Sequence, residues 1–183
     1  MKTFSAYLTE CLTYDPHSGY LFWKIRPQSH FPTKKGWSYF NSQFAGELAG
    51  SRHLCRGRNH CIKLTVVRNG VTHQLHAHNV AFAMMGVHVP EGFIVDHVDG
   101  DPFNNSWNNL RLATISQNAQ NKKGNAGREL PKGVYSSGKR FRSMIWHNGC
   151  HVTLGSHDTA AEAHEAYKAK AAELFGNFAR FNS

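Results

Sequence analysis

The chain has 183 residues and a formal net charge of +9, and its hydrophobic content of 40% is enough for a packed core. Wholesale disorder is therefore excluded, and so is a membrane-spanning helix, since no run approaches the roughly 18 apolar residues that one requires. Lys and Arg outnumber Asp and Glu by 21 to 12, which suits a polyanionic partner, either nucleic acid or an anionic membrane surface. The sequence offers no basic amphipathic helix that is free to bind a membrane, so the membrane is disfavoured. Glu10 interrupts the apolar N-terminal segment and no cleavage signature follows, so we expect a cytoplasmic protein that is not secreted.

The four cysteines, Cys11, Cys55, Cys61 and Cys150, include no CxxC pair. Without a secretory signal, the simplest expectation is that their thiols are reduced. Histidines near Cys55 and Cys61 raise the alternative of structural zinc, but the spacing matches no familiar zinc finger. Structural zinc is therefore disfavoured.

The N-terminal third begins with a predicted short helix over residues 4–12, followed by a turn and a strand at about 20–24. Residues 27–60 contain scattered Gly, Ser, Pro, Lys and Arg, so we expect a loop-rich region. The segment CIKLTVV, residues 61–67, alternates in polarity, and Asn69–Gly70 separates it from VTHQLHA. Asn-Gly between two such runs predicts a β-hairpin.

A second set of elements follows the hairpin. Residues 77–86 predict a mostly apolar helix that ends at Gly86, and FIVDH, residues 93–97, predicts a buried strand. The polar loop VDGDPFNNSWN precedes NLRLAT, residues 109–114, which predicts a returning strand. Thr114 and Gln117 have the spacing of a capping box, so a helix should begin there. The predicted order is therefore strand, loop, strand, helix.

The periodicity changes after a polar segment at residues 122–131, which we interpret as a linker. GVYSS, KRFRSMIWH and CHVTLG predict three short strands joined by turns at Ser137–Gly138 and Asn148–Gly149. Thr159 and Glu162 again have capping-box spacing, and Gly176 ends the helix that they open. The C-terminal segment, residues 132–183, is thus predicted to be a three-stranded antiparallel sheet packed on one helix.

Candidate catalytic chemistry lies in VDHVDGD, residues 95–101. A histidine can take a proton from water, and a hard cation such as Mg²⁺ accepts oxygen ligands while keeping several waters. Asp96 supplies a carboxylate beside His97, and Asn118, in the first turns of the following helix, supplies an amide oxygen. An EF-hand calcium loop is excluded by its spacing, so Asp99 and Asp101 are interpreted as an acidic turn.

Residues 96–121, DHVDGDPFNNSWNNLRLATISQNAQN, resemble the core of HNH endonucleases of the phage and intron-encoded homing type, which have the ββα-metal fold. The resemblance implies that His97 is the general base and that Asp96 and Asn118 bind one divalent cation. Mg²⁺ is the expected ion, with Mn²⁺ or Ca²⁺ also acceptable. Asn109 would orient the His97 ring or pin the loop.

His78, which precedes Asn79 where the family often has arginine, is interpreted as a core or hairpin-bracing histidine rather than a catalyst. Trp107 is interpreted as a hydrophobic anchor for the loop, with a wedge into duplex DNA as the alternative.

Residues 132–182 resemble the ethylene-response-factor (Apetala-type) DNA-binding domain, through GVY, FRSMI, TLGSHDTAAEA and the final G-x-x-A-x-x-N. The resemblance implies that the sheet lies in the major groove. The positions that would read bases are Tyr135, Met144, Trp146, His151 and Thr153. The basic residues expected to contact DNA are Lys122, Lys123, Lys132, Lys139, Arg140 and Arg142.

These interpretations predict an α+β protein of two modules, an HNH nuclease domain with N-terminal β-hairpins at 1–121 and an Apetala-type domain at 132–183. The predicted activity is metal-dependent hydrolysis of double-stranded DNA by a monomer or homodimer, in the bacterial host cytoplasm if a phage encodes it. Two alternatives stay open: a non-catalytic DNA-binding regulator on a nuclease scaffold, and a restriction or defence nuclease.

Overall fold

The computed structural model describes residues 3–54, 60–121 and 129–181. Contacts between Cα atoms divide the chain into two compact units, Met1–Leu112 and Ala113–Ser183. The division falls inside strand β7 (Leu110–Thr114), ahead of the segment interpreted as a linker. Helices and antiparallel strands are mixed in the fold, which confirms the predicted α+β class. None of the helices in the described ranges combines the length and apolar character needed to cross a membrane.

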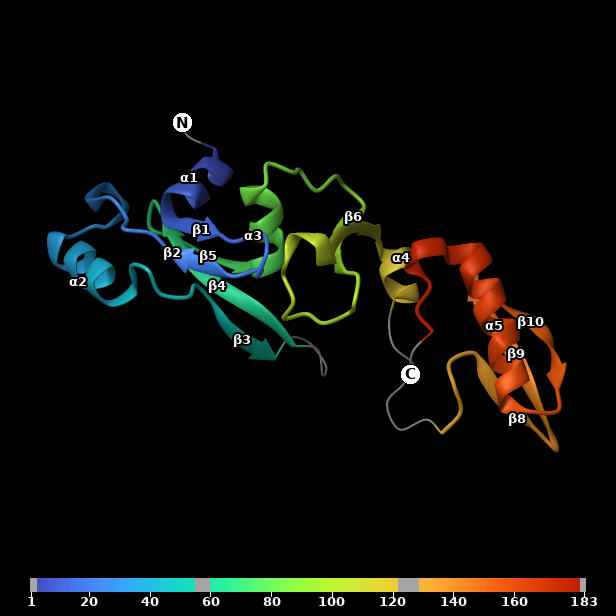
Figure 1. Cartoon of the computed structure of the whole chain (residues 1–183). Coiled ribbons are helices and arrows are strands. Elements are labelled where there is room, and N and C mark those ends of the chain that lie inside the picture. Colours follow the sequence, from blue (N-terminus) through green and yellow to red (C-terminus); the bar gives the residue numbers. More distant parts are fainter. Residues whose placement is uncertain (1–2, 55–59, 122–128, 182–183) are drawn as a thin grey trace. The chain divides into compact units, whose positions relative to one another are not determined.

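The N-terminal unit begins with elements that the sequence predicted (Figure 1). Helix α1 (Phe4–Cys11) starts at Thr3, whose side chain accepts a hydrogen bond from the Ala6 amide. Strands β1 (Leu12–Tyr14) and β2 (Leu21–Trp23) form an antiparallel pair across a turn. Tyr7, Leu8 and Cys11 bury the inner face of α1 in the core of this unit.

The expectation of a loop-rich segment at residues 27–60 is wrong. A 3₁₀ turn (Gln28–His30), helix α2 (Lys34–Phe44) and strand β3 (Ser51–Leu54) lie within it. The helix is fixed by tertiary contacts, since Phe40 packs with its ring centre 5.3 Å from that of Trp23 and the Trp37 indole donates to the Arg26 carbonyl. The sequence prediction missed this helix because it contains weak helix formers such as Gly36. Thr33 caps its N-terminus, and apolar residues with helical spacing follow.

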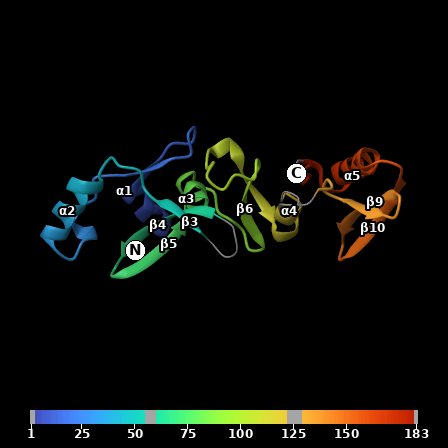
Figure 2. The ribbon, with the colours of Figure 1, turned by 90° about the horizontal axis from the view of Figure 1, so that it is seen from below.

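A three-stranded antiparallel sheet in the order β3-β4-β5 supports the centre of this unit. Strands β4 (His60–Arg68) and β5 (Val71–His76) are joined at Asn69–Gly70, where both residues have positive φ, as the predicted hairpin requires. Helix α3 (Ala77–Met84) follows directly and packs against β4, β5 and α1 (Figures 1 and 2). Its buried residues Val80 and Phe82 join the core that α1 and β4 also enter.

The predicted order of strand, loop, strand and helix is present. Strand β6 (Phe93–His97) pairs with β7, and helix α4 (Ile115–Gln120) follows with the Thr114–Gln117 capping box formed. One boundary differs, because Asn109 belongs to a 3₁₀ turn (Trp107–Asn109) and β7 begins at Leu110. The loop from Val98 to Ser106 therefore ends in a turn that redirects the Asn109 side chain inward, where it is buried.

The C-terminal unit contains the predicted three-stranded antiparallel sheet, in the order β10-β9-β8, with one helix. Its strands are β8 (Val134–Ser137), β9 (Arg140–His147) and β10 (Cys150–His157), and α5 (Ala160–Phe175) packs on the sheet (Figure 1). Ile145 of β9 meets Tyr167 and Ala171 of α5 in the core. Gly133 allows this approach, since a Cβ there would lie 2.0 Å from Cδ2 of Tyr167.

The cysteines differ in whether the sulfur is a free thiol or is held in a disulfide. Cys61 is disulfide-bonded, so the expectation of reduced thiols is wrong for this residue. Cys11 is a buried free thiol and Cys150 an exposed one, while Cys55 lies outside the described residues. A sulfur held in a disulfide offers no thiolate to a metal ion, which argues against a zinc site that includes Cys61.

Candidate functional site

The end of β6 carries two adjacent polar side chains in an unusually covered position. Asp96 and His97 are only 5% and 9% exposed, and Val95 before them is buried too. Successive side chains of a strand point to opposite faces, so three buried positions in a row require that both faces of β6 are covered. A buried carboxylate and imidazole need polar partners, and the surrounding elements supply them.

Asn105 is the side chain that holds the His97 ring. Its Oδ1 lies 3.1 Å from His97 Nε2, while its Nδ2 donates to the Phe103 carbonyl. Because the Nδ2 bond fixes the orientation of the amide, Oδ1 faces the ring and accepts a proton from Nε2–H. This hydrogen bond selects the tautomer of neutral His97 whose basic lone pair is on Nδ1.

Two further histidines lie beside His97. The His78 ring meets the His97 ring edge-on at 5.2 Å between centres, and His76 stacks on His78 at the same distance. Burial and the neighbouring His97 and His76 lower the pKa of His78 to about 3, so this ring is neutral at physiological pH. Sequence reasoning assigned His78 to the core or hairpin; the structure places it against the candidate base.

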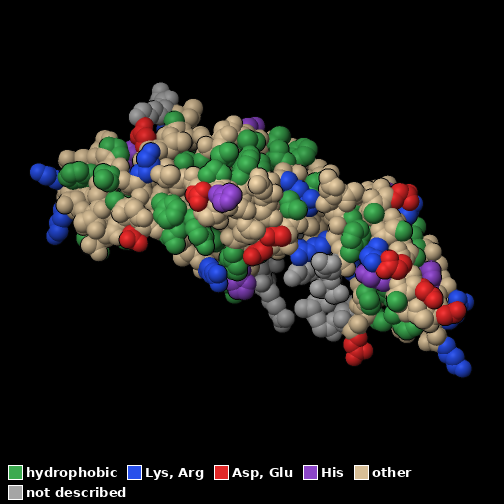
Figure 3. Space-filling model, in the orientation of Figure 1, with side chains coloured by type: hydrophobic (Ala, Val, Ile, Leu, Met, Phe, Trp, Pro, Cys, Tyr) green, Lys and Arg blue, Asp and Glu red, His purple; other side chains and the backbone are tan. Residues whose placement is uncertain are grey.

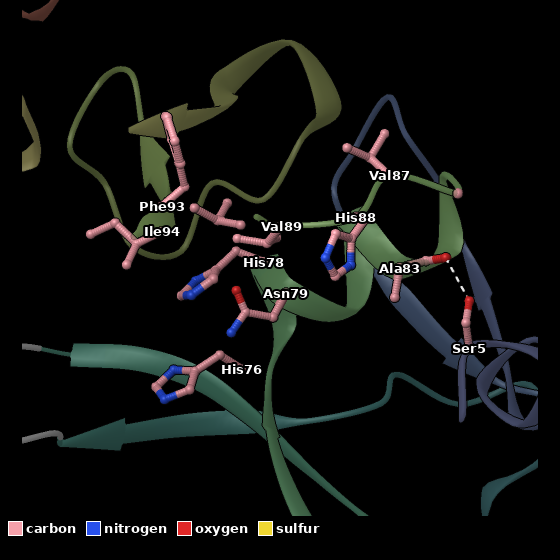
Figure 4. Close-up of a pocket in the computed structure, with 12 residues that line it drawn as sticks. Ser5, His76, His78, Asn79, Ala83, Val87, His88, Val89, Phe93 and Ile94 are labelled. Carbon is pink, nitrogen blue, oxygen red and sulfur yellow. Dashed lines mark hydrogen bonds between the residues drawn. The ribbon is translucent and has the colours of Figure 1, made fainter. Parts of the chain in front are cut away.

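A cavity of about 790 Å³ opens beside these rings. The rings of His76 and His78 point to the same side of it, and Asn79 and His88 line it from α3 and the segment that follows (Figure 4). Its remaining wall is mostly apolar and includes Val87, Val89, Phe93 and Ile94. The candidate base therefore has neighbours that border an open, partly apolar hollow.

Asp96 is paired with a cation from the returning strand. Nε of Arg111, on β7, lies 2.9 Å from Oδ2 of Asp96, and the two side chains are 16% and 5% exposed. The sequence prediction did not include Arg111. An arginine in a returning strand, opposite a strand that ends in a buried aspartate, was the available signal.

The side chain of Asn109 forms hydrogen bonds within the loop that follows β6. Its Nδ2 donates to Asp99 Oδ1 and to the Asn104 carbonyl, and its Oδ1 accepts from the Asp99 amide. Burial alone would raise the pKa of the Asp99 carboxyl, but hydrogen bonds from the Asp101 amide, Asn109 and Asn104 lower it. Of the two roles predicted for Asn109, the structure supports pinning the loop, and Asn105 makes the contact with His97.

The turn between β1 and β2 packs against the loop that follows β6. The Tyr14 hydroxyl donates to the Asn105 carbonyl at 2.7 Å, and the Trp107 amide donates to the Pro16 carbonyl. Gly19 has a φ of +77°, and a Cβ there would lie 2.2 Å from the Ser106 amide nitrogen, so only glycine fits. Trp107 packs on Phe82, as its interpretation as a hydrophobic anchor requires.

Asn118, the other predicted metal ligand, lies on α4 in the second unit and is partly buried. The capping box at Thr114 fixes the start of this helix, so the position of Asn118 along it is well defined. Its participation in a metal site with Asp96 stays a prediction.

The outer face of the C-terminal sheet brings the predicted base-reading residues together. Cross-strand neighbours share a face of a sheet, and the registered pairs are Tyr135 with Arg142, Met144 with Thr153, and Trp146 with His151. Trp146 is 51% exposed and its ring contacts that of His151. Ser143 and Ile145, which alternate with them on β9, are buried on the side of the sheet opposite to this face.

The basic residues predicted to contact DNA differ in their surroundings. Lys139 and Arg142 are exposed, whereas Arg140 forms an ion pair with Asp158 at 2.9 Å. Burial and the nearby Arg180 lower the pKa of Lys132, whose ammonium donates to the Gln120 carbonyl. Lys122 and Lys123 lie outside the described residues. Lys and Arg side chains occur over both units on the face drawn in Figure 3, with acidic side chains among them.

The segment from β6 to α4 has the element order strand, strand, helix, with an Asp–His pair at the end of the first strand. Residues 75–120 match the family model described as HNH endonuclease. Protein 3.8 of Escherichia phage T7 is 33% identical over 96 residues, which cover 51% of this chain and 78% of that protein. The chain therefore belongs to the HNH endonuclease family, and residues 75–120 are its HNH endonuclease domain.

Two other similar proteins carry the HNH name. Uncharacterized HNH endonuclease L560 of Acanthamoeba polyphaga mimivirus is 36% identical over 95 residues, and the chain spans about half of that protein, 49% of its length. A solved structure, described as DNA binding and cleavage by the HNH homing endonuclease I-HmuI, is 19% identical with a TM-score of 0.38. That match covers 60% of this chain and 50% of the other.

Proposed function

We propose that this chain is a metal-dependent endonuclease that hydrolyses phosphodiester bonds in double-stranded DNA. The observation that carries the proposal is the buried Asp96–His97 pair at the end of β6, inside the segment that matches the HNH endonuclease model. The net charge of +9 supports a polyanionic substrate. A homing role, as in the phage and intron-encoded type, is part of the proposal.

His97 acts as the general base. The Nε2–H bond to Asn105 leaves the basic lone pair on Nδ1, which takes a proton from water as the water oxygen attacks phosphorus. The bond from phosphorus to the 3′ oxygen breaks, and the leaving oxygen is protonated by solvent. The products are a 3′ hydroxyl and a 5′ phosphate, and His97 releases the proton that it took from water to the solvent.

Asp96 and Asn118 are the residues that would hold one divalent cation. A carboxylate and an amide oxygen are a donor set that fits a hard ion such as Mg²⁺, and Mn²⁺ or Ca²⁺ would also be accepted. When bound, the cation supplies positive charge to the phosphate and to the leaving oxygen. The buried position of Asp96 supports this role, because a carboxylate shielded from water is held in one orientation.

The C-terminal sheet serves as the DNA-targeting surface, as the Apetala-type resemblance implies. The exposed face with Tyr135, Arg142 and Trp146 supports this assignment, since it combines a cation with aromatic rings that can contact sugars and bases. One active site cuts one strand at each docking event. A double-strand break therefore requires a second protomer or a second visit.

Plasmid nicking in the presence of Mg²⁺ or Mn²⁺ tests the proposal. His97→Ala should reduce nicking by roughly 10²–10⁴-fold, the usual contribution of a general base, and should keep DNA affinity within about twofold of the wild type. His17→Ala, a change to an exposed histidine in a turn, is the matched control and should nick normally. Tight binding by the wild type without cleavage of any DNA would contradict the proposal and support a DNA-binding regulator.

A further inference from the structure

Arg111 and Asp96 form a pair that the proposed chemistry does not use. Nε of Arg111 donates to Oδ2 of Asp96 at 2.9 Å, with 16% of the arginine side chain and 5% of the aspartate side chain exposed. Charges this far from water are weakly screened, so each strongly affects what else can bind nearby. Asp96 is also the carboxylate proposed to bind the cation, so two positive groups would share it.

A dication at Asp96 would lie beside the Arg111 guanidinium, because both positive groups would contact the same carboxylate. Like charges in a poorly hydrated place repel each other strongly. A DNA phosphodiester carries one negative charge, which attracts both positive groups and offsets part of this repulsion. Asp99 is exposed, and its carboxylate oxygens accept hydrogen bonds from Asn109, Asn104 and the Asp101 amide within the loop.

We propose that Arg111 is a positioning residue that couples cation binding to DNA binding. It holds the Asp96 carboxylate through Oδ2 in the free protein. The guanidinium also opposes a dication at Asp96 until a phosphate arrives to compensate the charge. The free protein therefore binds the cation weakly, and the cation and DNA bind with positive cooperativity. The inference rests on the proposed function, because it concerns a cation bound at Asp96.

The first measurement is Mn²⁺ binding to the full-length chain without DNA, followed by the electron paramagnetic resonance signal of free Mn²⁺. Arg111→Gln removes the charge and should bind Mn²⁺ at least about tenfold more tightly than the wild type, as expected for a charge within a few ångströms of the ion. Arg111→Lys keeps the charge and should stay within about threefold of the wild type. Equal or weaker binding by Arg111→Gln overturns the inference.

The second measurement adds a double-stranded oligonucleotide, using His97→Ala chains so that the DNA stays intact. DNA should tighten Mn²⁺ binding by at least about tenfold when Arg111 is present, a coupling of ordinary size for two linked sites. The gain should shrink several-fold when Arg111→Gln is combined with His97→Ala. The same gain in both backgrounds overturns the coupling role. Mn²⁺ binding that Asp96→Asn leaves unchanged also overturns it, because the ion is then bound elsewhere.

Folding provides an independent readout, because Arg111→Gln leaves a buried carboxylate without this cation. If the variant unfolds at a lower temperature, Mn²⁺ should raise its midpoint more than that of the wild type, since the dication replaces the missing charge. Equal shifts in the two proteins overturn the inference. If the wild type nicks plasmid while Arg111→Gln shows unchanged Mn²⁺ affinity, the inference fails and the proposed function stands. If the wild type neither nicks DNA nor binds Mn²⁺ with DNA present, both fail.

Discussion

The loop that follows β6 and the outer face of the C-terminal sheet use polar side chains in opposite ways. In the loop, Asn105 and Asn109 are 1% and 8% exposed, and their side-chain amides bond to neighbouring backbone and side chains. On the sheet, Tyr135 and Trp146 are 38% and 51% exposed. Hydrogen bonds fix the side chains of the first region in place, whereas the side chains of the second region are exposed to solvent.

The difference follows from what each region has to do in the proposed function. A general base must be held in one tautomer and one orientation, because small displacements at a reacting centre are costly in rate. A surface that contacts DNA must present its groups to phosphates and bases, and water can fill the gaps. Substitutions in the loop should therefore change the rate of cleavage, and substitutions on the sheet should change affinity.

Among substitutions outside the Asp96–His97 pair, the largest effect is expected from Asn105→Ala. The substitution removes the acceptor from His97 Nε2–H, so the ring loses its fixed tautomer, and it leaves buried groups of the loop unpaired. Single-turnover cleavage should fall by at least about 100-fold, as for loss of a well-oriented base. The free energy of unfolding should fall by about 1–3 kcal/mol, the usual cost of unpairing a buried group. DNA affinity, measured by fluorescence anisotropy, should change little.

Asn108→Ala is the matched control, because Asn108 is exposed in the 3₁₀ turn that follows the loop. It should cleave at the wild-type rate and unfold at the wild-type temperature. If Asn105→Ala lowered DNA affinity instead and cleaved normally at saturating DNA, Asn105 would be a binding residue and the contrast between the two regions would not hold.

A smaller effect, confined to affinity, is expected on the sheet. Arg142→Ala should weaken DNA binding by about tenfold and reduce the slope of log affinity against log salt by about 1, as for one lost phosphate contact. Trp146→Ala should weaken binding by a similar factor through lost stacking, about 1–3 kcal/mol per base, and leave the salt slope unchanged. Cleavage at saturating DNA should stay near the wild-type rate in both.

Lys168→Ala provides the control for the sheet, since Lys168 lies on α5, pairs with Glu165 and carries the same charge as Arg142. Its effect on affinity should be below about twofold, the range of a solvated surface charge. Binding that weakened as much as with Arg142→Ala would mean that net charge, and not the sheet face, directs DNA to this unit.

The parts predicted from sequence are those with local signals. Capping boxes at Thr114 and Thr159, the Asn69–Gly70 turn and the Asp96–His97 pair are each readable from a few neighbouring residues. Helix α2 was missed because its stability comes from aromatic packing around Arg26, whose guanidinium lies over the Phe40 ring at 5.0 Å. Such packing depends on partners that are distant in sequence.

The candidate site also contains some residues that were predictable from the sequence and others that were not. The resemblance to HNH endonucleases singled out His97 and Asn109, but it could not show that Asn105 holds the ring. That role depends on a loop closed by Asn109 and on Tyr14, which is 91 positions away and donates to the Asn105 carbonyl. Arg111 was read only as part of a motif, because its pairing with Asp96 requires the register of two strands. Contacts between residues that are distant in sequence close this loop, and such contacts could not be predicted from the single sequence.

The smallest predicted effect is a dependence of the free energy of unfolding on pH, which comes from His78. The pKa of His78 is lowered to about 3 by burial, then by His97 and His76, so it lies well below the unfolded-state value. Between about pH 3 and 6.5 the unfolded chain binds a proton that the folded chain does not, so stability falls as pH drops through this window. At pH 5.5 the loss from His78 should be about 1 kcal/mol relative to pH 8.

Denaturant unfolding at pH 8 and pH 5.5 measures how much the free energy of unfolding falls on acidification. His78→Gln should show a loss on acidification that is about 1 kcal/mol smaller than in the wild type, because the titrating group is gone. His17→Gln, at an exposed position, should keep the wild-type dependence. An unchanged acid loss in His78→Gln would mean that His78 takes up its proton without unfolding. The row of rings beside His97 would then contain a titrating neighbour rather than a permanently neutral one.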